Sequence, residues 1–399
     1  MTNTTVAGTA PPVMDLFPSD EERALRETVS QIAHGFGHTW YMDQVRNGGG
    51  AREMWDVLGA QGFLGVCLPE EYGGGGQSLH ALVAVMEETA AAGCPMVPLV
   101  FSQAICGQLI TKFGTEQHKK DWIPGIASGA LRFSFAITEP DAGTNSHKIS
   151  THAVKSADGG WVLSGTKTFI SGVEDADKIV VVARTGDRPD GRGGLLSLFI
   201  VDADAVGMER QLIPMAVDVP EKQWTLFFDD VRVSGDRLIG GENNGLRAVF
   251  EGLNPERILG ATQTIGLGRF ALDKAVRYAT ERNVWGVPIG AHQGVSHPLA
   301  AAKVELEAAK LLVQKACALY DAADPRAGEV ANMAKYAAGE AGTHCIDQAI
   351  QVHGGNGLTL EYGLTDVWWL ARLIKIAPVS HQMVLNFVAE HSLGLPKSY

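Results

Sequence analysis

The pattern of hydrophobic residues changes twice along the chain, and this change constrains the fold more than any other feature. From about residue 19 to 130 the pattern is helical, and from 131 to 244 short apolar runs are separated by Gly and Asp. From 245 onward helical spacing returns, with Ala-rich helices predicted over about 298–320, 327–353 and 365–391. The sequence therefore predicts an α+β protein with an N-terminal all-helical domain (19–130), a central β domain (131–244) and a C-terminal helical domain (245–399).

Local signals agree with this division. Residues 1–18 are predicted to form a flexible tail, and Ser19 followed by acidic residues is typical of a helix N-terminus. Residues 151–156 and 161–170 flank an Asp158-Gly159 turn and predict a β-hairpin. Glycine runs at 48–50 and 73–76 predict loops within the helical half.

Composition excludes several functional classes. The formal net charge of −12 argues against nucleic acid as a partner, because phosphate binding needs a basic surface. The sequence contains no run of 18 apolar residues, so no membrane span is predicted. The first residues lack the features of a signal peptide. The five cysteines are scattered and form no CxxC pair, which is typical of reduced thiols. We therefore expect a cytoplasmic protein.

Common catalytic and nucleotide-binding motifs are missing from the sequence. No Gly-x-Gly-x-x-Gly follows a strand, and no His-Glu-x-x-His or Gly-x-Ser-x-Gly occurs. We find no cluster of residues with metal-ligand spacing, so no metal site is predicted. The chemistry must be sought in other motifs.

Several ordered motifs together resemble the acyl-CoA dehydrogenase family. Residues 138–144 read Thr-Glu-Pro-Asp-Ala-Gly-Thr, residues 165–172 read Gly-Thr-Lys-Thr-Phe-Ile-Ser-Gly, and residues 351–357 read Gln-Val-His-Gly-Gly-Asn-Gly. Segments 69–74 and 229–233 also fit, so the resemblance extends over about residues 19–395. It implies an N-terminal helical domain, a β domain and a C-terminal four-helix domain, which is the order inferred from the hydrophobic pattern.

The resemblance implies that FAD is the cofactor and that the β domain holds its flavin end. Flavin requires a flat apolar slot with a few hydrogen-bonding groups at its edge. By this resemblance, the pyrimidine side of the flavin is lined by Phe135, Ile137 and Thr138, and Gly143 lets the backbone approach closely. Thr144 contacts the FAD pyrophosphate, Phe169 packs on the flavin ring, and Ser171 hydrogen-bonds near the flavin N5. Ile170 belongs to the same matching motif.

A second set of residues is implied to bind FAD from the helical half. In the family the adenine half is bound by a neighbouring subunit, and two residues of the last segment also contact the cofactor. The matching residues are Arg282, Trp285, Gln293, Gln351, Gly354, Gly355, Ser380 and Gln382. A shared site implies a homo-oligomer, expected to be a tetramer built as a dimer of dimers.

The chain departs from the family at the position where many members carry their catalytic Glu. Pro378 stands there, and no carboxylate is nearby. Proline also lacks the backbone N–H that donates to the thioester carbonyl in the family. The sequence leaves three replacements open: the N–H of Val379, the N–H of Ala377, or a ribityl hydroxyl of FAD acting alone.

A second position for the base is offered by Leu253-Asn254-Pro255-Glu256-Arg257, which resembles a motif of isovaleryl- and long-chain-type members. The resemblance implies that Glu256 is the catalytic base and that Thr144, Asn254 and Arg257 contact the acyl-CoA. Pro255 suggests the first turn of a helix. The alternative is that Glu256 is only an acid at a helix start, with Arg257 as a surface partner.

The resulting functional hypothesis is dehydrogenation of an acyl-CoA to the trans-2-enoyl-CoA, with electrons passed to an electron-transfer flavoprotein. An oxidase or a flavin monooxygenase on the same fold remains open, since a monooxygenase needs no α-proton base. A catalytically silent subunit of a larger assembly is a further alternative. Acyl chain length cannot be inferred from these motifs.

Overall fold

The computed structural model describes residues 17–189 and 193–397, so the predicted tail lies almost wholly outside the described residues. The N-terminal domain is helical, as predicted. Its helices are α1 (Asp20–Arg46), α2 (Arg52–Ala60), α3 (Leu79–Ala91), a π-helical segment Leu99–Gly107 that continues into α4 (Gln108–Phe113), and α5 (Glu116–Ser128). Ser19 is the N-cap of α1, because its Oγ accepts the Glu22 N–H at 3.1 Å.

The central domain is built on one sheet. Its strands are β1 (Phe133–Ala136), β2 (His152–Lys155), β3 (Trp161–Ser171), β4 (Lys178–Asp187), β5 (Gly194–Asp202), β6 (Met208–Ile213), β7 (Gln223–Val233) and β8 (Leu238–Ile239). They are ordered β6-β7-β3-β2-β4-β5-β8, with β1 paired parallel to β4. Antiparallel pairing of β2 with β3 confirms the hairpin around Asp158-Gly159, whereas β1, β6 and β8 were not predicted.

The C-terminal domain is again helical, as predicted. Its elements are α6 (Gly245–Glu281), the two-stranded hairpin β9 (Asn283–Val284) and β10 (Val287–Pro288), α7 (Gln293–Asp321), α8 (Ala327–His353), α9 (Leu364–Leu373) and α10 (His381–Phe387). The prediction of one helix over 365–391 is wrong. Pro378 has no N–H to donate to an i−4 carbonyl, and the chain runs irregularly through 374–380 between α9 and α10.

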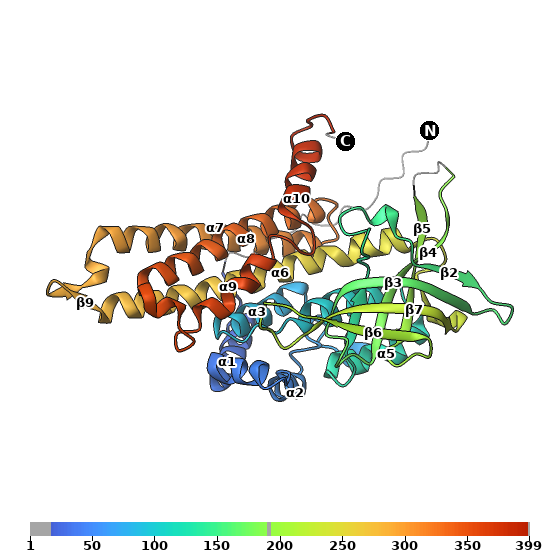
Figure 1. The fold of residues 1–399 in the computed structure, drawn as a ribbon, viewed down its shortest axis with the longest axis horizontal. Coiled ribbons are helices and arrows are strands. Elements are labelled where there is room, and N and C mark those ends of the chain that lie inside the picture. Colours follow the sequence, from blue (N-terminus) through green and yellow to red (C-terminus); the bar gives the residue numbers. More distant parts are fainter. Residues whose placement is uncertain (1–16, 190–192, 398–399) are drawn as a thin grey trace.

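The helical bundle and the sheet lie at opposite ends of an elongated molecule, with the N-terminal helices packed along one side (Figure 1). One hydrophobic core joins α1–α3 to the C-terminal helices, with Trp55, Leu259 and Val313 among its buried residues. A second core lies between the sheet, the π-helical segment and the start of α6. No helix in the described part of the chain combines the length and apolarity that crossing a membrane requires. The start of α6 therefore lies where all three domains meet.

Candidate active site

Glu256 lies well inside α6 and not in its first turn. The helix begins at Gly245, so the prediction that Pro255 occupies the first turn is wrong. Gly245 starts the helix against β5, where any Cβ would lie 2.7 Å from the Leu196 carbonyl oxygen. This start places Glu256 about three turns along α6. A helix-start acid stabilised by the helix dipole, the alternative reading, does not describe this residue.

The Glu256 carboxyl group has little access to water. Its Oε2 atom is buried and has no hydrogen-bond partner among the described residues. Burial raises the pKa of Glu256 to about 7, while the positive charges of Arg257 and Lys335 oppose this rise. A carboxyl group that titrates near neutral pH can accept a proton from a weak carbon acid and release it later.

Arg257 is buried too, which contradicts the alternative that it is a surface charge. Only 6% of the surface of Arg257 is exposed. The Nη1 atom donates to Asn254 Oδ1 at 3.2 Å, whereas Nε is buried and has no partner among the described residues. The motif residues Asn254, Glu256 and Arg257 thus form one polar group at the junction of the domains. An unsatisfied guanidinium N–H inside the protein is free to bind a ligand.

A lysine that the sequence reasoning missed completes this polar group. Lys335 of α8 is fully buried, and its Nζ donates to the Val379 carbonyl oxygen. Burial lowers the pKa of Lys335 to about 8, although the Glu256 carboxylate opposes this. A charged residue between Ala334 and Tyr336 in an Ala-rich helix was the signal that could have identified it.

The 374–380 segment carries the position of the missing Glu. The Ala377 N–H donates to Leu373 O at 2.9 Å and is therefore already engaged. By contrast, the Val379 N–H has no acceptor among the described residues. Ser380 caps α10 by accepting the Met383 N–H at 3.4 Å. Of the backbone donors considered for the thioester oxygen, Val379 is the one left unbonded.

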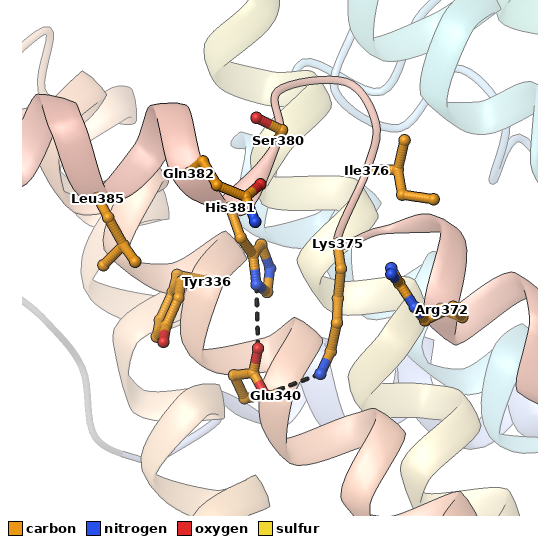
Figure 2. Close-up of a pocket in the computed structure, with 9 residues that line it drawn as sticks. All are labelled: Tyr336, Glu340, Arg372, Lys375, Ile376, Ser380, His381, Gln382 and Leu385. Atoms are coloured by element: carbon orange, nitrogen blue, oxygen red, sulfur yellow. Dashed lines mark hydrogen bonds and ion pairs between the residues drawn. The ribbon is translucent and has the colours of Figure 1, made fainter.

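The same segment borders a cavity of about 370 Å³. Its lining includes Ser380 and Gln382, the two residues of this region that were predicted to bind the cofactor. Figure 2 shows Glu340, one of its lining residues, joined by dashed lines to His381 and Lys375. Glu340 accepts from His381 Nδ1 at 3.0 Å and from Lys375 Nζ at 2.7 Å. Burial and the charge of Lys335 lower the pKa of His381 to about 4, so its ring is neutral at neutral pH.

The β-domain residues predicted for flavin are brought together by a buried ion pair. Lys167 of β3 donates from Nζ to the Ile137 carbonyl oxygen and to Glu139 Oε1, both at 2.9 Å. The Glu139 carboxylate also accepts the N–H groups of Ser150 and Thr151. The Thr168 N–H donates to Thr138 O at 2.9 Å. These bonds hold the loop after β1 against the end of β3.

The end of β3 presents an aromatic ring and a hydroxyl group. The pairing with β7 shifts between Lys167 and Ile170, and Phe169 has a φ of 55° with 56% of its surface exposed. Ser171 Oγ lies 2.9 Å from Gln223 Nε2. The Ile170 side chain is 1% exposed in the core of the sheet, so only its backbone can face a ligand.

The remaining residues of the first set leave room for a ligand. A Cβ added to Gly143 would meet no atom within 4 Å, and both Gly143 and Thr144 are exposed. Phe135 and Ile137 are half-buried apolar residues beside the second core. An open backbone, an exposed aromatic face and a hydroxyl group fit the slot that a flavin ring requires.

Six residues of the second set lie elsewhere in the same chain, whereas Ser380 and Gln382 lie at the start of α10 as described above. Arg282 directly follows α6 and lies about 39 Å from Glu256, measured along the helix axis. Trp285, 89% exposed, forms the β9–β10 turn at the end of the bundle away from the sheet (Figure 1). Gln293 starts α7, Gln351 lies in the last turn of α8, and Gly354 and Gly355 follow that helix. These six residues, called the remote set below, are not brought together with the β-domain set in one chain.

Comparison with known proteins finds a family model for each of the three domains. Models of the acyl-CoA dehydrogenase N-terminal, middle and C-terminal domains match residues 19–130, 134–231 and 243–393. Acyl-CoA dehydrogenase FadE12 of Mycobacterium tuberculosis (strain ATCC 25618 / H37Rv) is 51% identical over 382 residues, which cover 96% of this chain and 98% of FadE12.

Two solved structures share the fold over nearly their whole length. A glutaryl-coenzyme A dehydrogenase in complex with glutaryl-CoA has a TM-score of 0.90 at 32% identity, covering 96% of this chain and 98% of that one. A structure described with the electron transferring flavoprotein of Acidaminococcus fermentans has a TM-score of 0.89 at 29% identity, covering 95% and 100%. These matches and the three family models confirm the resemblance inferred from the motifs. The chain belongs to the acyl-CoA dehydrogenase family, whose members are oxidoreductases that act on acyl-CoA.

Proposed function

We propose that the protein is an FAD-dependent dehydrogenase that converts an acyl-CoA to the trans-2-enoyl-CoA, with Glu256 as the base. The observation that carries this proposal is the buried Oε2 of Glu256, which has no partner among the described residues and lies in a group with Arg257 and Lys335. The position of the missing Glu, Pro378, adjoins Val379, whose carbonyl oxygen accepts from Lys335. The two alternative positions for a base are thus linked through one side chain.

The chain's own residues account for proton removal. The ionised Glu256 carboxylate accepts the proton from the α-carbon, and the β-hydrogen leaves with its electron pair, so the α–β bond becomes double. FAD, when bound, supplies the acceptor for that hydride. The developing charge on the thioester oxygen needs a donor, and the unbonded Val379 N–H is the candidate in place of the N–H that Pro378 lacks.

The β-domain set and the remote set are proposed to bind one FAD from two subunits. Phe169, Ser171 and Gly143 suit the flavin end, while Arg282 and Gln351 lie at the far ends of α6 and α8. A second copy must supply the remote set, which favours a homo-oligomer and is compatible with the expected tetramer. An electron-transfer flavoprotein is the proposed acceptor of the electrons, supported by the likeness to the structure from Acidaminococcus fermentans.

The first test is whether the purified protein contains FAD and forms an oligomer. We expect a yellow protein with about one FAD per chain and a light-scattering mass above that of a single chain. A colourless protein that takes up no FAD, or a monomer that keeps FAD tightly, would contradict the shared site. Anaerobic titration with a panel of acyl-CoAs should then bleach the flavin. Hydroxylation without anaerobic bleaching would favour the monooxygenase alternative.

A second expectation concerns Arg257. Replacing it by Ala should raise the KM for acyl-CoA about tenfold or more, because a charge-assisted hydrogen bond to the substrate is lost. Steady-state kinetics measure the effect, and Arg257→Lys should restore part of it. The matched control is Arg247→Ala, an exposed arginine of the same helix. An unchanged KM in Arg257→Ala would assign Arg257 to helix packing alone.

A further inference from the structure

Lys335 occupies a position that is costly for a lysine. The residue has no exposed surface, and the only hydrogen bond of its Nζ among the described residues is to the neutral Val379 carbonyl oxygen. One bond to a neutral acceptor leaves two of the three ammonium donors unused. A buried cation is retained at such a site when a negative charge lies close enough to offset the loss of water.

The titratable and charged groups that interact with Lys335 or with Glu256 come from three elements. From α6, Glu256 favours the charged form of Lys335, while Arg257 opposes it. From α10, the neutral ring of His381 lies within the field of Lys335 and is bonded to Glu340. From the π-helical segment, Cys106 contributes a thiol whose pKa is raised by burial and by the negative charge of Glu256. Glu256 is therefore the carboxylate that compensates Lys335.

Lys335 also connects the base to the chain segment that carries Pro378. Its bond to the Val379 carbonyl fixes the segment from the side of α8, and the Val379 N–H has no acceptor among the described residues. Two requirements of proton abstraction, an ionised base and a fixed donor for the carbonyl oxygen, thus depend on one ammonium group.

We propose that Lys335 is a positioning residue for proton abstraction, whose ammonium group stabilises the ionised form of Glu256 and anchors Val379 through its carbonyl oxygen. The proposal rests on the dehydrogenase function proposed above. Its distinguishing consequence is electrostatic: without the positive charge, Glu256 should hold its proton to a higher pH. A residue that only packs α8 against the 374–380 segment would not change that titration.

The test uses the FAD-loaded enzyme and two variants. Lys335→Gln keeps a donor for the Val379 carbonyl and removes the charge, whereas Lys335→Met removes both. The ionisation of Glu256 is followed without substrate as the pH-dependent infrared band of a protonated carboxyl group that is absent from Glu256→Gln. The pH dependence of anaerobic flavin reduction by acyl-CoA is measured in parallel.

Both variants should shift the Glu256 titration, and with it the rising limb of the pH–rate profile, upward by about one pH unit. Lys335→Arg should return the limb towards that of the wild type. The matched control is Lys274→Met, because Lys274 is a partly buried lysine that likewise donates to a backbone carbonyl, that of Tyr362, at 2.6 Å. An unshifted titration in Lys335→Gln would overturn the proposal. A wild-type enzyme that no acyl-CoA bleaches would instead count against the dehydrogenase function, and the infrared titration would still decide the role of Lys335.

Discussion

Replacing Glu256 by Gln should slow anaerobic flavin reduction by acyl-CoA at least about a hundredfold, the lower end of what a general base contributes. The amide keeps the size of the side chain and cannot accept the α-proton. Because burial raises the pKa of Glu256 to about 7, the wild-type carboxyl is well matched to proton transfer near neutral pH, and this match is lost in the variant. Stopped-flow absorbance of the flavin, at saturating substrate, measures the rate.

The comparison needs evidence that only the proton-transfer step has changed. FAD content and acyl-CoA affinity should be preserved in Glu256→Gln, since no predicted cofactor contact involves this residue. Glu251→Gln is the matched control, because Glu251 lies on the same helix but is exposed and paired with Lys112. Bleaching of Glu256→Gln at the wild-type rate would show that the base lies elsewhere in the chain.

The order of the three domains could be predicted because each has its own hydrophobic period. The hairpin around Asp158-Gly159 and the cap at Ser19 depend on neighbouring residues alone, and both were predicted correctly. Strand β6 was missed because its residues are partly or fully exposed at the edge of the sheet, so that no alternation of buried and exposed residues marks it. Strands β1 and β8 are four and two residues long, which is too short to show a period.

Helix ends that depend on tertiary contacts could not be predicted. Pro255 suggested a helix start, yet α6 begins ten residues earlier because Gly245 packs against the backbone of β5. The continuous helix expected over 365–391 is interrupted around Pro378, between α9 and α10. Periodicity describes which face of a segment is apolar, and it does not define where packing ends the helix.

The candidate site shows the same division between local and long-range information. Glu256 and Arg257 were proposed from a short motif, but only the structure reveals that Arg257 is buried, that Glu256 has a buried carboxyl oxygen, and that Lys335, 78 or more residues away in sequence, interacts with both through its charge. The motifs identify the remote set, which includes Arg282, Trp285 and Gln351. The distance between that set and the β domain depends on the length of α6, which the motifs do not give. Contacts between distant segments carry no signature in a single sequence.

The largest effect on stability is expected at the ion pair that supports the flavin loop. Lys167 and Glu139 have side chains 0% and 3% exposed, so removing one charge leaves the other buried without its partner. Lys167→Met should therefore lower the free energy of unfolding by about 3 kcal/mol or more. It should also weaken FAD retention, because the Ile137 carbonyl and the loop after β1 lose their anchor. Urea unfolding of the apoprotein and FAD release on dilution measure the two effects.

The matched control and the pH dependence separate this buried pair from an ordinary surface pair. Lys178→Met, in β4, removes the partner of Asp202 at a pair that is 23% and 42% exposed, and should cost only about 0–1 kcal/mol.

Burial alone would raise the pKa of Glu139, but Lys167 and the bonds from Thr151 and Ser150 lower it to about 2. Because the folded-state pKa is depressed, this stabilisation is present above the ordinary carboxyl range and is lost as the pH falls towards about 2. The stability difference between wild type and Lys167→Met should accordingly shrink below about pH 4, where an unfolded Glu becomes protonated. A constant difference from pH 7 down to pH 3 would mean that Lys167 stabilises the β domain through its packed methylene chain and not through its charge.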